Sequence, residues 1–221
     1  MSLQQGQFEA QHGLPALPYL ITVPENAGQN GEKLPLIVFL HGAGERGTDP
    51  KALYNVISVP SLLRDDPEYK GVRAITLSPQ CPPNLVWNHL VLAVRELIDW
   101  AVANYPVDED RISITGLSMG GFGTWDMACT YPNLFSAAAP ICGGGLTWRA
   151  GLLKNLPIRA FHGDADTCVP LCNSEAMVEA VNLCGGHAEL TIFPGVDHNS
   201  WTPAYCDTDV IPWLASQTRK K

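Results

Sequence analysis

A serine set between glycines is the feature of this sequence that most clearly points to chemistry. Ser118 stands in the run GLSMGG at residues 116–121. A short apolar alternation at 111–115 precedes it and is expected to form a strand, and residues 122–129 are expected to form a helix. A G-x-S-x-G pattern between a strand and a helix is typical of a nucleophile elbow, which holds the serine hydroxyl at the carboxyl edge of a sheet. The alternative is a glycine-rich turn that merely contains a serine, and the flanking elements argue against it.

A serine hydroxyl is a poor nucleophile at neutral pH and needs an adjacent base, which a third group must orient. When the nucleophile stands on such an elbow, the partners follow in the order Ser, Asp or Glu, His, each in a loop after a later strand. His198 follows the last expected strand, residues 190–193, and is the predicted base. His162 closes its own strand and is expected to pack or hydrogen-bond locally, whereas His187 follows a helix and is expected to be exposed.

The acid is expected in the loop at residues 163–170, where Asp164 and Asp166 both qualify by position. Asp166 is preferred because two more residues let the loop reach across toward His198, while a Val-Pro pair pins the far end of the loop. Asp164 is the alternative. Asp197 is a weaker candidate because it is the immediate neighbour of the histidine and points elsewhere. Each could instead be an ordinary turn aspartate.

A tetrahedral intermediate needs backbone N–H groups aimed at its oxyanion. One donor is expected to be the amide of Met119, which follows the serine, and the other to come from the glycine-rich loop 41–47. That loop follows an almost unbroken apolar run at 34–40. Ala43 is the preferred second donor and Gly44 the alternative. The loop lacks the Lys-Ser/Thr ending of a phosphate-binding loop, so nucleotide binding is not expected.

The elements that must position these residues alternate between strands and helices. This alternation predicts an α/β fold with a mainly parallel central sheet and helices on both faces. A polar turn at 25–33 is expected to join hairpin strands, and the absence of linkers or repeats predicts one domain over residues 1–221. Expected strands are 18–23, 34–40, 72–77, 111–115, 134–141, 158–162 and 190–193, and expected helices are 87–101, 122–129, 173–183 and 207–216.

The amino-acid composition limits the kinds of binding partner that are expected. The chain of 221 residues carries 14 basic and 22 acidic side chains, a net charge of −8, which argues against a nucleic-acid or anionic-membrane surface. No run approaches the length of a membrane helix, and residues 1–10 lack the pattern of a signal peptide, so a cytoplasmic location is expected. The seven cysteines form no C-x-x-C motif and are expected to be free thiols, with a link between Cys168 and Cys172 left open.

Five motifs together resemble the serine esterases of the α/β-hydrolase superfamily. They are HGAGERG at 41–47, GLSMGG at 116–121, PICGG at 140–144, GDADTCVP at 163–170 and the Asp-His pair at 197–198. The resemblance runs from about residue 34 to residue 201 and is closest to the predicted-peptidase, phospholipase/carboxylesterase and polyhydroxybutyrate-depolymerase-like branch. It implies that Asp166 of the G-x-x-D-x-x-V-P pattern is the acid and that Ala43 supplies an oxyanion amide. Dienelactone hydrolases in this group use a cysteine, so Ser118 argues against their activity.

The sequence thus predicts a serine carboxylesterase that acts on small-molecule esters through an acyl-enzyme, with no metal or organic cofactor. The chain is short for the superfamily and shows no insertion long enough for a cap domain, which favours an open site and short acyl chains. Trp87 and Trp201 are hypothesised to line the substrate pocket, against the alternative that they pack in the core. A thioesterase, a lysophospholipase, a small serine peptidase and a non-enzymatic binding module are the alternative functions.

Overall fold

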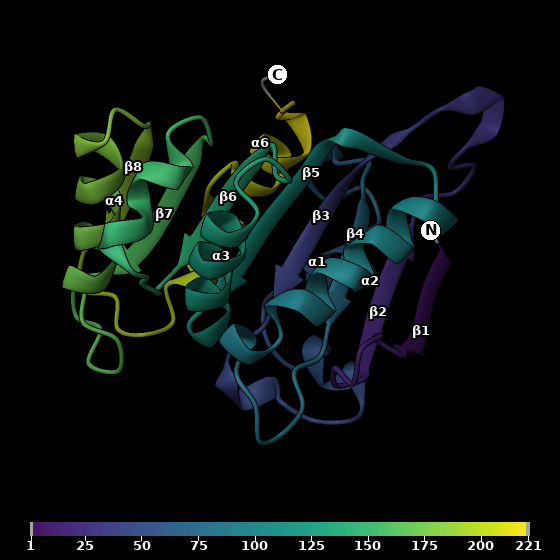
Figure 1. Cartoon of the computed structure of the whole chain (residues 1–221), viewed down its shortest axis with the longest axis horizontal. Coiled ribbons are helices and arrows are strands. Elements are labelled where there is room, and N and C mark those ends of the chain that lie inside the picture. Colours follow the sequence, from purple (N-terminus) through teal and green to yellow (C-terminus); the bar gives the residue numbers. More distant parts are fainter. Residues whose placement is uncertain (1, 220–221) are drawn as a thin grey trace.

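A computed structural model, which describes residues 2–219, shows one eight-stranded sheet with the strand order β1-β2-β4-β3-β5-β6-β7-β8 (Figure 1). Strands β3 to β8 pair in parallel, while β2 is antiparallel to both β1 and β4. The strands are β1 Ser2–Phe8, β2 Leu17–Val23, β3 Leu34–Leu40, β4 Ile75–Pro79, β5 Val107–Leu117, β6 Ala137–Ile141, β7 Ile158–Gly163 and β8 Ala188–Phe193. The predicted α/β class with a mainly parallel sheet is confirmed.

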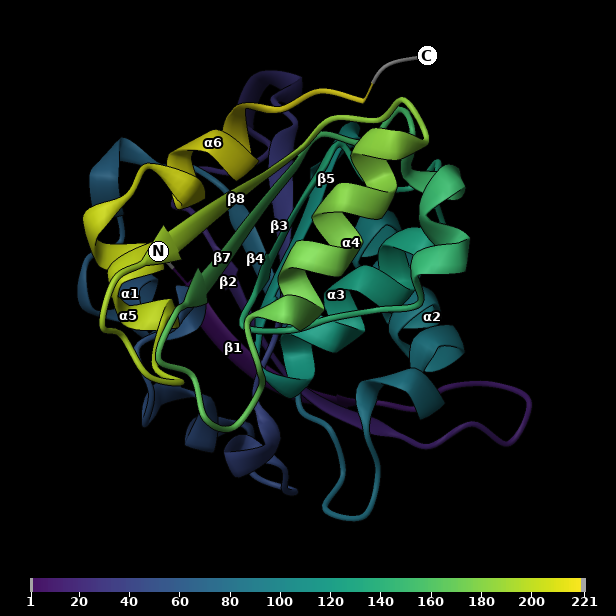
Figure 2. The same cartoon turned by 90° about the vertical axis from the view of Figure 1, so that its left-hand side faces the viewer.

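Helices cover both faces of this sheet. Figure 2 shows α1, α5 and α6 on one face and α2, α3 and α4 on the other. The α-helices are α1 Val59–Asp65, α2 Val91–Asn104, α3 Met119–Thr130, α4 Cys172–Leu183, α5 Trp201–Asp207 and α6 Val210–Ser216. Short 3-10 turns are η1 Gln29–Gly31, η2 Ala43–Glu45, η3 Pro50–Tyr54, η4 Tyr69–Gly71, η5 Trp87–His89 and η6 Thr147–Leu153.

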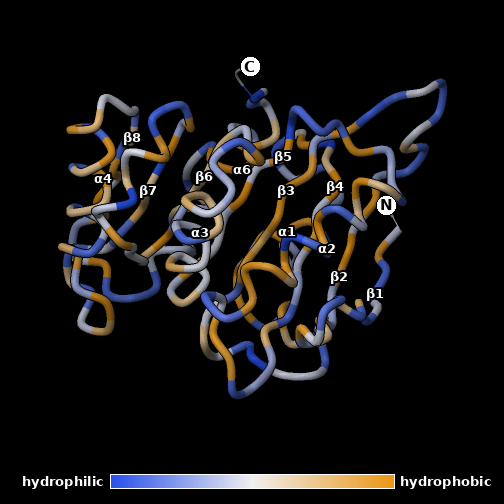
Figure 3. Tube along the Cα trace, in the orientation of Figure 1, coloured by the Kyte–Doolittle hydropathy of each residue, from blue (hydrophilic) through white to orange (hydrophobic). Residues whose placement is uncertain are grey.

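The unbroken apolar run of β3 follows from this layering. Its side chains alternate between two separate cores, with Leu36, Val38 and Leu40 in the core under α2, α3 and α4. Ile37 and Phe39 lie in the core under α1, α5 and α6. A central parallel strand that is covered on both faces has no solvent side, and all seven residues of β3 are buried. Figure 3 shows the hydrophobic colouring concentrated on the strands and the hydrophilic colouring on the connecting loops.

Several expected elements differ from the observed ones. The prediction of a hairpin around residues 25–33 is wrong, because β4 lies between β2 and β3 in the sheet. The polar N-terminal residues form the edge strand β1, and α1 was not expected. The closing helix expected at 207–216 is α6, with Pro212 in its first turn, and the preceding helix α5 was not expected. Among residues 2–219, no helix has both the length and the apolar character needed to cross a bilayer.

Candidate active site

Ser118 occupies a strained turn between β5 and α3. Its backbone has φ 52° and ψ −117°, and it forms the N-cap position of α3. Its amide donates to the carbonyl of Ile141 at 2.9 Å, which ties the turn to the end of β6. A Cβ at Gly120 would clash with the backbone carbonyl of Leu40, so glycine is required two residues after the serine. A positive φ at a serine is a strained conformation of the kind that clusters at active sites.

The structure brings Ser118, His198 and Asp166 into one hydrogen-bonded chain. His198 Nε2 lies 2.9 Å from Ser118 Oγ, and His198 Nδ1 lies 2.8 Å from Asp166 Oδ2. The Asp166 side chain is fully buried, while that of His198 is 22% exposed and stands at the rim. Burial alone would raise the pKa of Asp166, but hydrogen bonds from His198 and from the backbone amides of Val169 and Cys168 outweigh it and lower the pKa. The carboxylate is therefore charged at neutral pH and suited to stabilise an imidazolium.

The two other aspartates near the histidine join the loops instead. Asp164 Oδ1 accepts from the amide of Gly195 at 2.6 Å. Asp197 Oδ1 accepts from the amide of Thr167 at 3.1 Å, and this bond contributes most to the lowered pKa of Asp197. Both carboxylates connect the loop after β7 with the loop after β8. Of the three candidate acids, Asp166 is the one whose carboxylate contacts the ring of His198.

The amides of Ala43 and Met119 stand at the first positions of η2 and α3. Amides in the first turn of a helix have no acceptor within the helix and remain available to a ligand. The Ala43 loop is held by His41, whose Nδ1 donates to the carbonyl of Gly42 at 2.6 Å and whose Nε2 accepts from the amide of Cys81 at 2.9 Å. Burial lowers the pKa of His41 to about 4, so the ring is neutral at pH 7.

The two predicted pocket tryptophans have different locations. Trp87 is only 1% exposed, its Nε1 donates to the carbonyl of His41 at 2.9 Å, and its ring lies edge-on to the His41 ring at 4.9 Å. A side chain so enclosed offers no surface to a substrate, so Trp87 supports the Ala43 loop from the core and the pocket prediction for it is wrong. Trp201 is half-buried, and its ring centroid lies 5.5 Å from that of His198.

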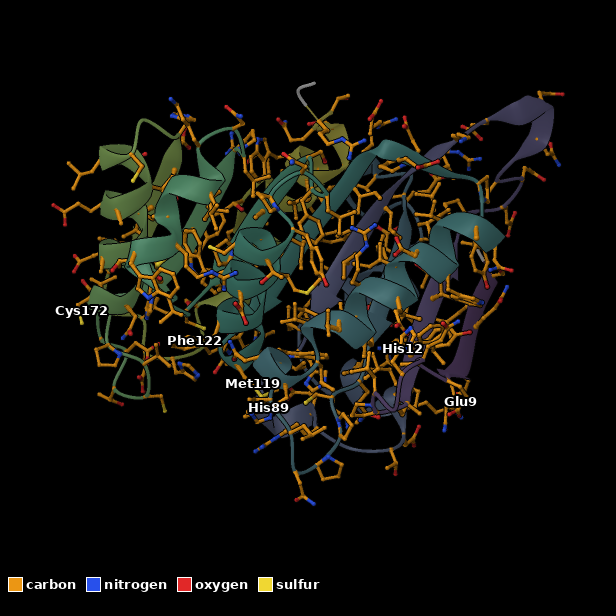
Figure 4. The ribbon with its side chains drawn as sticks, viewed as in Figure 1. Glu9, His12, His89, Met119, Phe122 and Cys172 are labelled. Atoms are coloured by element: carbon orange, nitrogen blue, oxygen red, sulfur yellow. The ribbon has the colours of Figure 1, made fainter. Side chains whose placement is uncertain are left out.

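A cavity of about 240 Å³ opens along α3, one helical turn beyond the serine. Its lining combines the apolar side chains of Phe122 and Leu146 with the polar side chains of Asn88, Asp126 and Arg149. The Phe122 amide donates to the carbonyl of Ser118 at 3.1 Å, so this wall of the cavity lies one helical turn from the elbow, while Ser118 and His198 are not among the lining residues. Figure 4 shows Met119 and Phe122 at the same end of α3, close to His89.

Cys142 was not singled out from the sequence, and His162 was expected only to pack or hydrogen-bond locally, which it does. Cys142 follows β6, and its sulfur lies within 4.8 Å of ligand atoms of Asp166 and His198. Burial raises the pKa of Cys142 to about 12, and a thiol that stays protonated is a poor metal ligand. Because His198 Nδ1 already bonds to Asp166, the geometry favours a hydrogen-bonded site over a metal site. His162 contacts the buried side of Asp166, and its position just before a glycine at a strand end was the available signal.

The cysteines are all free thiols. Cys168 and Cys172, between which a link had been left open, are both exposed and unpaired with each other.

Comparisons with known proteins identify the family of this chain. The protein family described as Phospholipase/Carboxylesterase matches residues 87–207, and a second family of esterases matches residues 17–145. Each match covers more than half of the chain.

Named relatives match shorter segments. Poly(3-hydroxyalkanoate) depolymerase C of Paucimonas lemoignei is 47% identical over 53 residues, which are 24% of this chain and 13% of that protein. Acetylxylan esterase A of Emericella nidulans is 39% identical over 51 residues, which are 23% of this chain and 17% of that protein. The matched segments therefore span far less than two thirds of either relative.

Solved structures match the whole fold. A thermostable esterase superposes with a TM-score of 0.90 at 38% identity, over 98% of this chain and 63% of that one. A feruloyl esterase module from Clostridium thermocellum superposes with a TM-score of 0.78 over 100% of this chain and 90% of that one, and at 14% identity it supports the fold alone. The chain thus belongs to the phospholipase/carboxylesterase family, a group of carboxylic-ester hydrolases with the α/β-hydrolase fold.

Proposed function

We propose that this chain, as a single domain, is a serine carboxylesterase that hydrolyses short-chain carboxylic esters of small molecules. The observation that carries the proposal is the continuous hydrogen-bond chain from Ser118 Oγ through the His198 ring to the buried Asp166 carboxylate. A serine, an imidazole and a carboxylate in this order form the general arrangement for acyl transfer through a covalent intermediate.

In the proposed mechanism Ser118 Oγ attacks the ester carbonyl carbon while His198 Nε2 takes the hydroxyl proton. Asp166 holds the ring through Nδ1 and stabilises the imidazolium that forms. The amides of Met119 and Ala43 donate to the oxyanion of the tetrahedral intermediate. His198 then returns the proton to the departing alcohol, and an acyl group remains on Ser118. Water, deprotonated by the same nitrogen, attacks the acyl-enzyme and releases the acid.

We propose a short acyl group because the volume of the cavity along α3 is small. The cavity along α3, one helical turn from the elbow, measures about 240 Å³ and is proposed to receive a small acyl group. Trp201, half-buried beside His198, is proposed as a second wall of the substrate site. The relatives named as an acetylxylan esterase and a poly(3-hydroxyalkanoate) depolymerase support an ester as the bond that is cleaved.

Hydrolysis of a p-nitrophenyl ester series from acetate to palmitate tests the proposal. The full chain should turn over acetate and butyrate fastest, and Ser118→Ala should abolish turnover and labelling by a fluorophosphonate probe. Ser216→Ala is the matched control, because Ser216 is an exposed serine on α6 and should leave both readouts unchanged. Absence of ester turnover by the folded wild-type chain would refute the esterase proposal and make thioesters and peptides the next substrates to test.

A further inference from the structure

A second histidine, His162, contacts the carboxylate of the proposed acid, Asp166. His162 is the last residue but one of β7 and stands four residues before Asp166, and both side chains are fully buried. His162 Nε2 lies 2.9 Å from the carbonyl oxygen of Val169 and 3.2 Å from Asp166 Oδ2. His162 Nδ1 lies 2.7 Å from Ser174 Oγ. No step of the proposed mechanism uses this ring.

The neighbours of the ring determine which nitrogen carries the proton. A carbonyl and a carboxylate can only accept, so Nε2 must hold a hydrogen, which bonds to the carbonyl of Val169 while Asp166 Oδ2 lies 3.2 Å from the same nitrogen. Nδ1 contacts the oxygen of Ser174 at 2.7 Å, and the hydroxyl of Ser174 donates to the carbonyl of Gly143 at 2.9 Å. The ring of His162 is thus a fixed N–H donor that holds Val169, whose amide bonds to Asp166 Oδ1, and that lies against Asp166 Oδ2.

The donors around Asp166 are divided between its two oxygens. Oδ1 accepts from the amides of Cys168 at 2.9 Å and Val169 at 2.8 Å. Oδ2 accepts from His198 at 2.8 Å and faces the His162 donor at 3.2 Å. Two imidazole rings therefore contact one carboxylate oxygen, and His198 is the one that hydrogen-bonds to it. Without the His162 donor, only the His198 bond would hold Oδ2, and that bond is the one that must keep its direction during catalysis.

The same ring connects the acid to the elbow. Ser174 lies on α4, and Gly143 lies in the turn after β6, where its Cα packs so tightly on Gly121 and Phe122 that a Cβ would meet their backbone. The contacts from Asp166 through His162, Ser174 and Gly143 therefore end on the first turn of α3. All the side chains in this series are buried.

We infer that His162 is a positioning residue, which fixes the orientation of the Asp166 carboxylate so that Oδ2 is aimed at His198 Nδ1. This inference rests on the proposed function, since it concerns the same triad. His162 touches no reacting atom and acts only through Asp166.

Two substitutions of His162 separate the effect of its N–H donor from the effect of the volume of its ring. In His162→Gln the side-chain amide nitrogen can reach the place of Nε2 and keep a donor toward Asp166, whereas in His162→Asn the shorter amide reaches only the place of Nδ1. With p-nitrophenyl acetate, His162→Asn should lower kcat by about 10²-fold with KM unchanged, the loss expected when a catalytic group is misplaced by about 1 Å. His162→Gln should recover most of that loss. His187→Asn, at a histidine whose side chain is 78% exposed, is the control and should match the wild type.

The proton between His198 Nδ1 and Asp166 Oδ2 provides a readout that does not depend on turnover. Its far-downfield proton NMR resonance should be present in the wild type and in His162→Gln, and shifted or lost in folded His162→Asn. A His162→Asn variant with normal kcat and an unchanged resonance would overturn the inference, as would equal losses in both variants. Because the resonance comes from the resting protein, it tests the role of His162 even where the ester assay refutes the proposed function.

Discussion

Mild acid should destabilise this fold through His41. The ring is buried as a neutral group, and burial lowers its pKa from the ordinary 6.5 to about 4. Because the folded-state pKa lies below the unfolded one, the unfolded chain binds the proton first as the pH falls. The contribution of His41 to the stability is therefore complete above pH 6.5 and is lost across the window from 6.5 down to about 4.

The size of this effect follows from the two pKa values. A decrease from 6.5 to about 4, at about 1.36 kcal/mol for each pH unit, corresponds to about 3 kcal/mol of the free energy of unfolding. Glu45 Oε2 lies 4.0 Å from His41 Nδ1 and would offset part of the loss once the ring is charged. For a domain with a typical stability of about 5–15 kcal/mol, the loss is a large fraction.

Urea unfolding of the wild type and His41→Gln at pH 7, 6, 5 and 4.5 measures the effect. His41→Gln should be less stable at pH 7, because its amide cannot reproduce both ring hydrogen bonds, but its stability should decline less steeply below pH 6.5. The difference in slope isolates His41, because all other titrating groups are common to both chains. Parallel pH profiles would refute the argument that burial of a neutral imidazole creates the sensitivity to acid.

Two further predictions concern the acid and the thiols. Asp166→Asn should lower kcat for p-nitrophenyl acetate by about 10⁴-fold, because the amide favours the wrong tautomer of His198, while near-normal turnover would transfer the role to Asp164. In a timed thiol titration with Ellman's reagent, the exposed cysteines should react within the first phase and the buried ones only after unfolding, with Cys206 between them. A first phase that needs a reductant would instead indicate a linked pair. The fast group is Cys168, Cys172 and Cys184, and the slow group is Cys81, Cys129 and Cys142.

The sequence predicts this fold best where the signal is local. Residues 34–40 have the continuous apolar character that burial on both faces requires, and the GLSMGG run is constrained by a turn only a few residues long. Strand β1 was not predicted, because an exposed edge strand needs no alternation of apolar and polar residues. The strand order, in which β4 separates β2 from β3, depends on long-range pairing that no local pattern records.

The same distinction holds for the site. Ser118, His198 and Asp166 could be placed because each follows a recognisable strand, and the structure brings them together. Trp87 was misplaced because its burial depends on the packing of η5 against the Ala43 loop. The contact of His162 with Asp166 was not predicted, because it depends on how the loop after β7 folds back on the end of that strand.

The bonds of Asp164 and Asp197 between the two loops have a mechanical consequence. They join the segment that carries the acid to the segment that carries the base, at the β7–β8 side of the sheet. The nucleophile stands between β5 and α3, and its connection to the acid runs through His162, Ser174 and Gly143. Loosening of either loop would therefore change the placement of the acid and the base together.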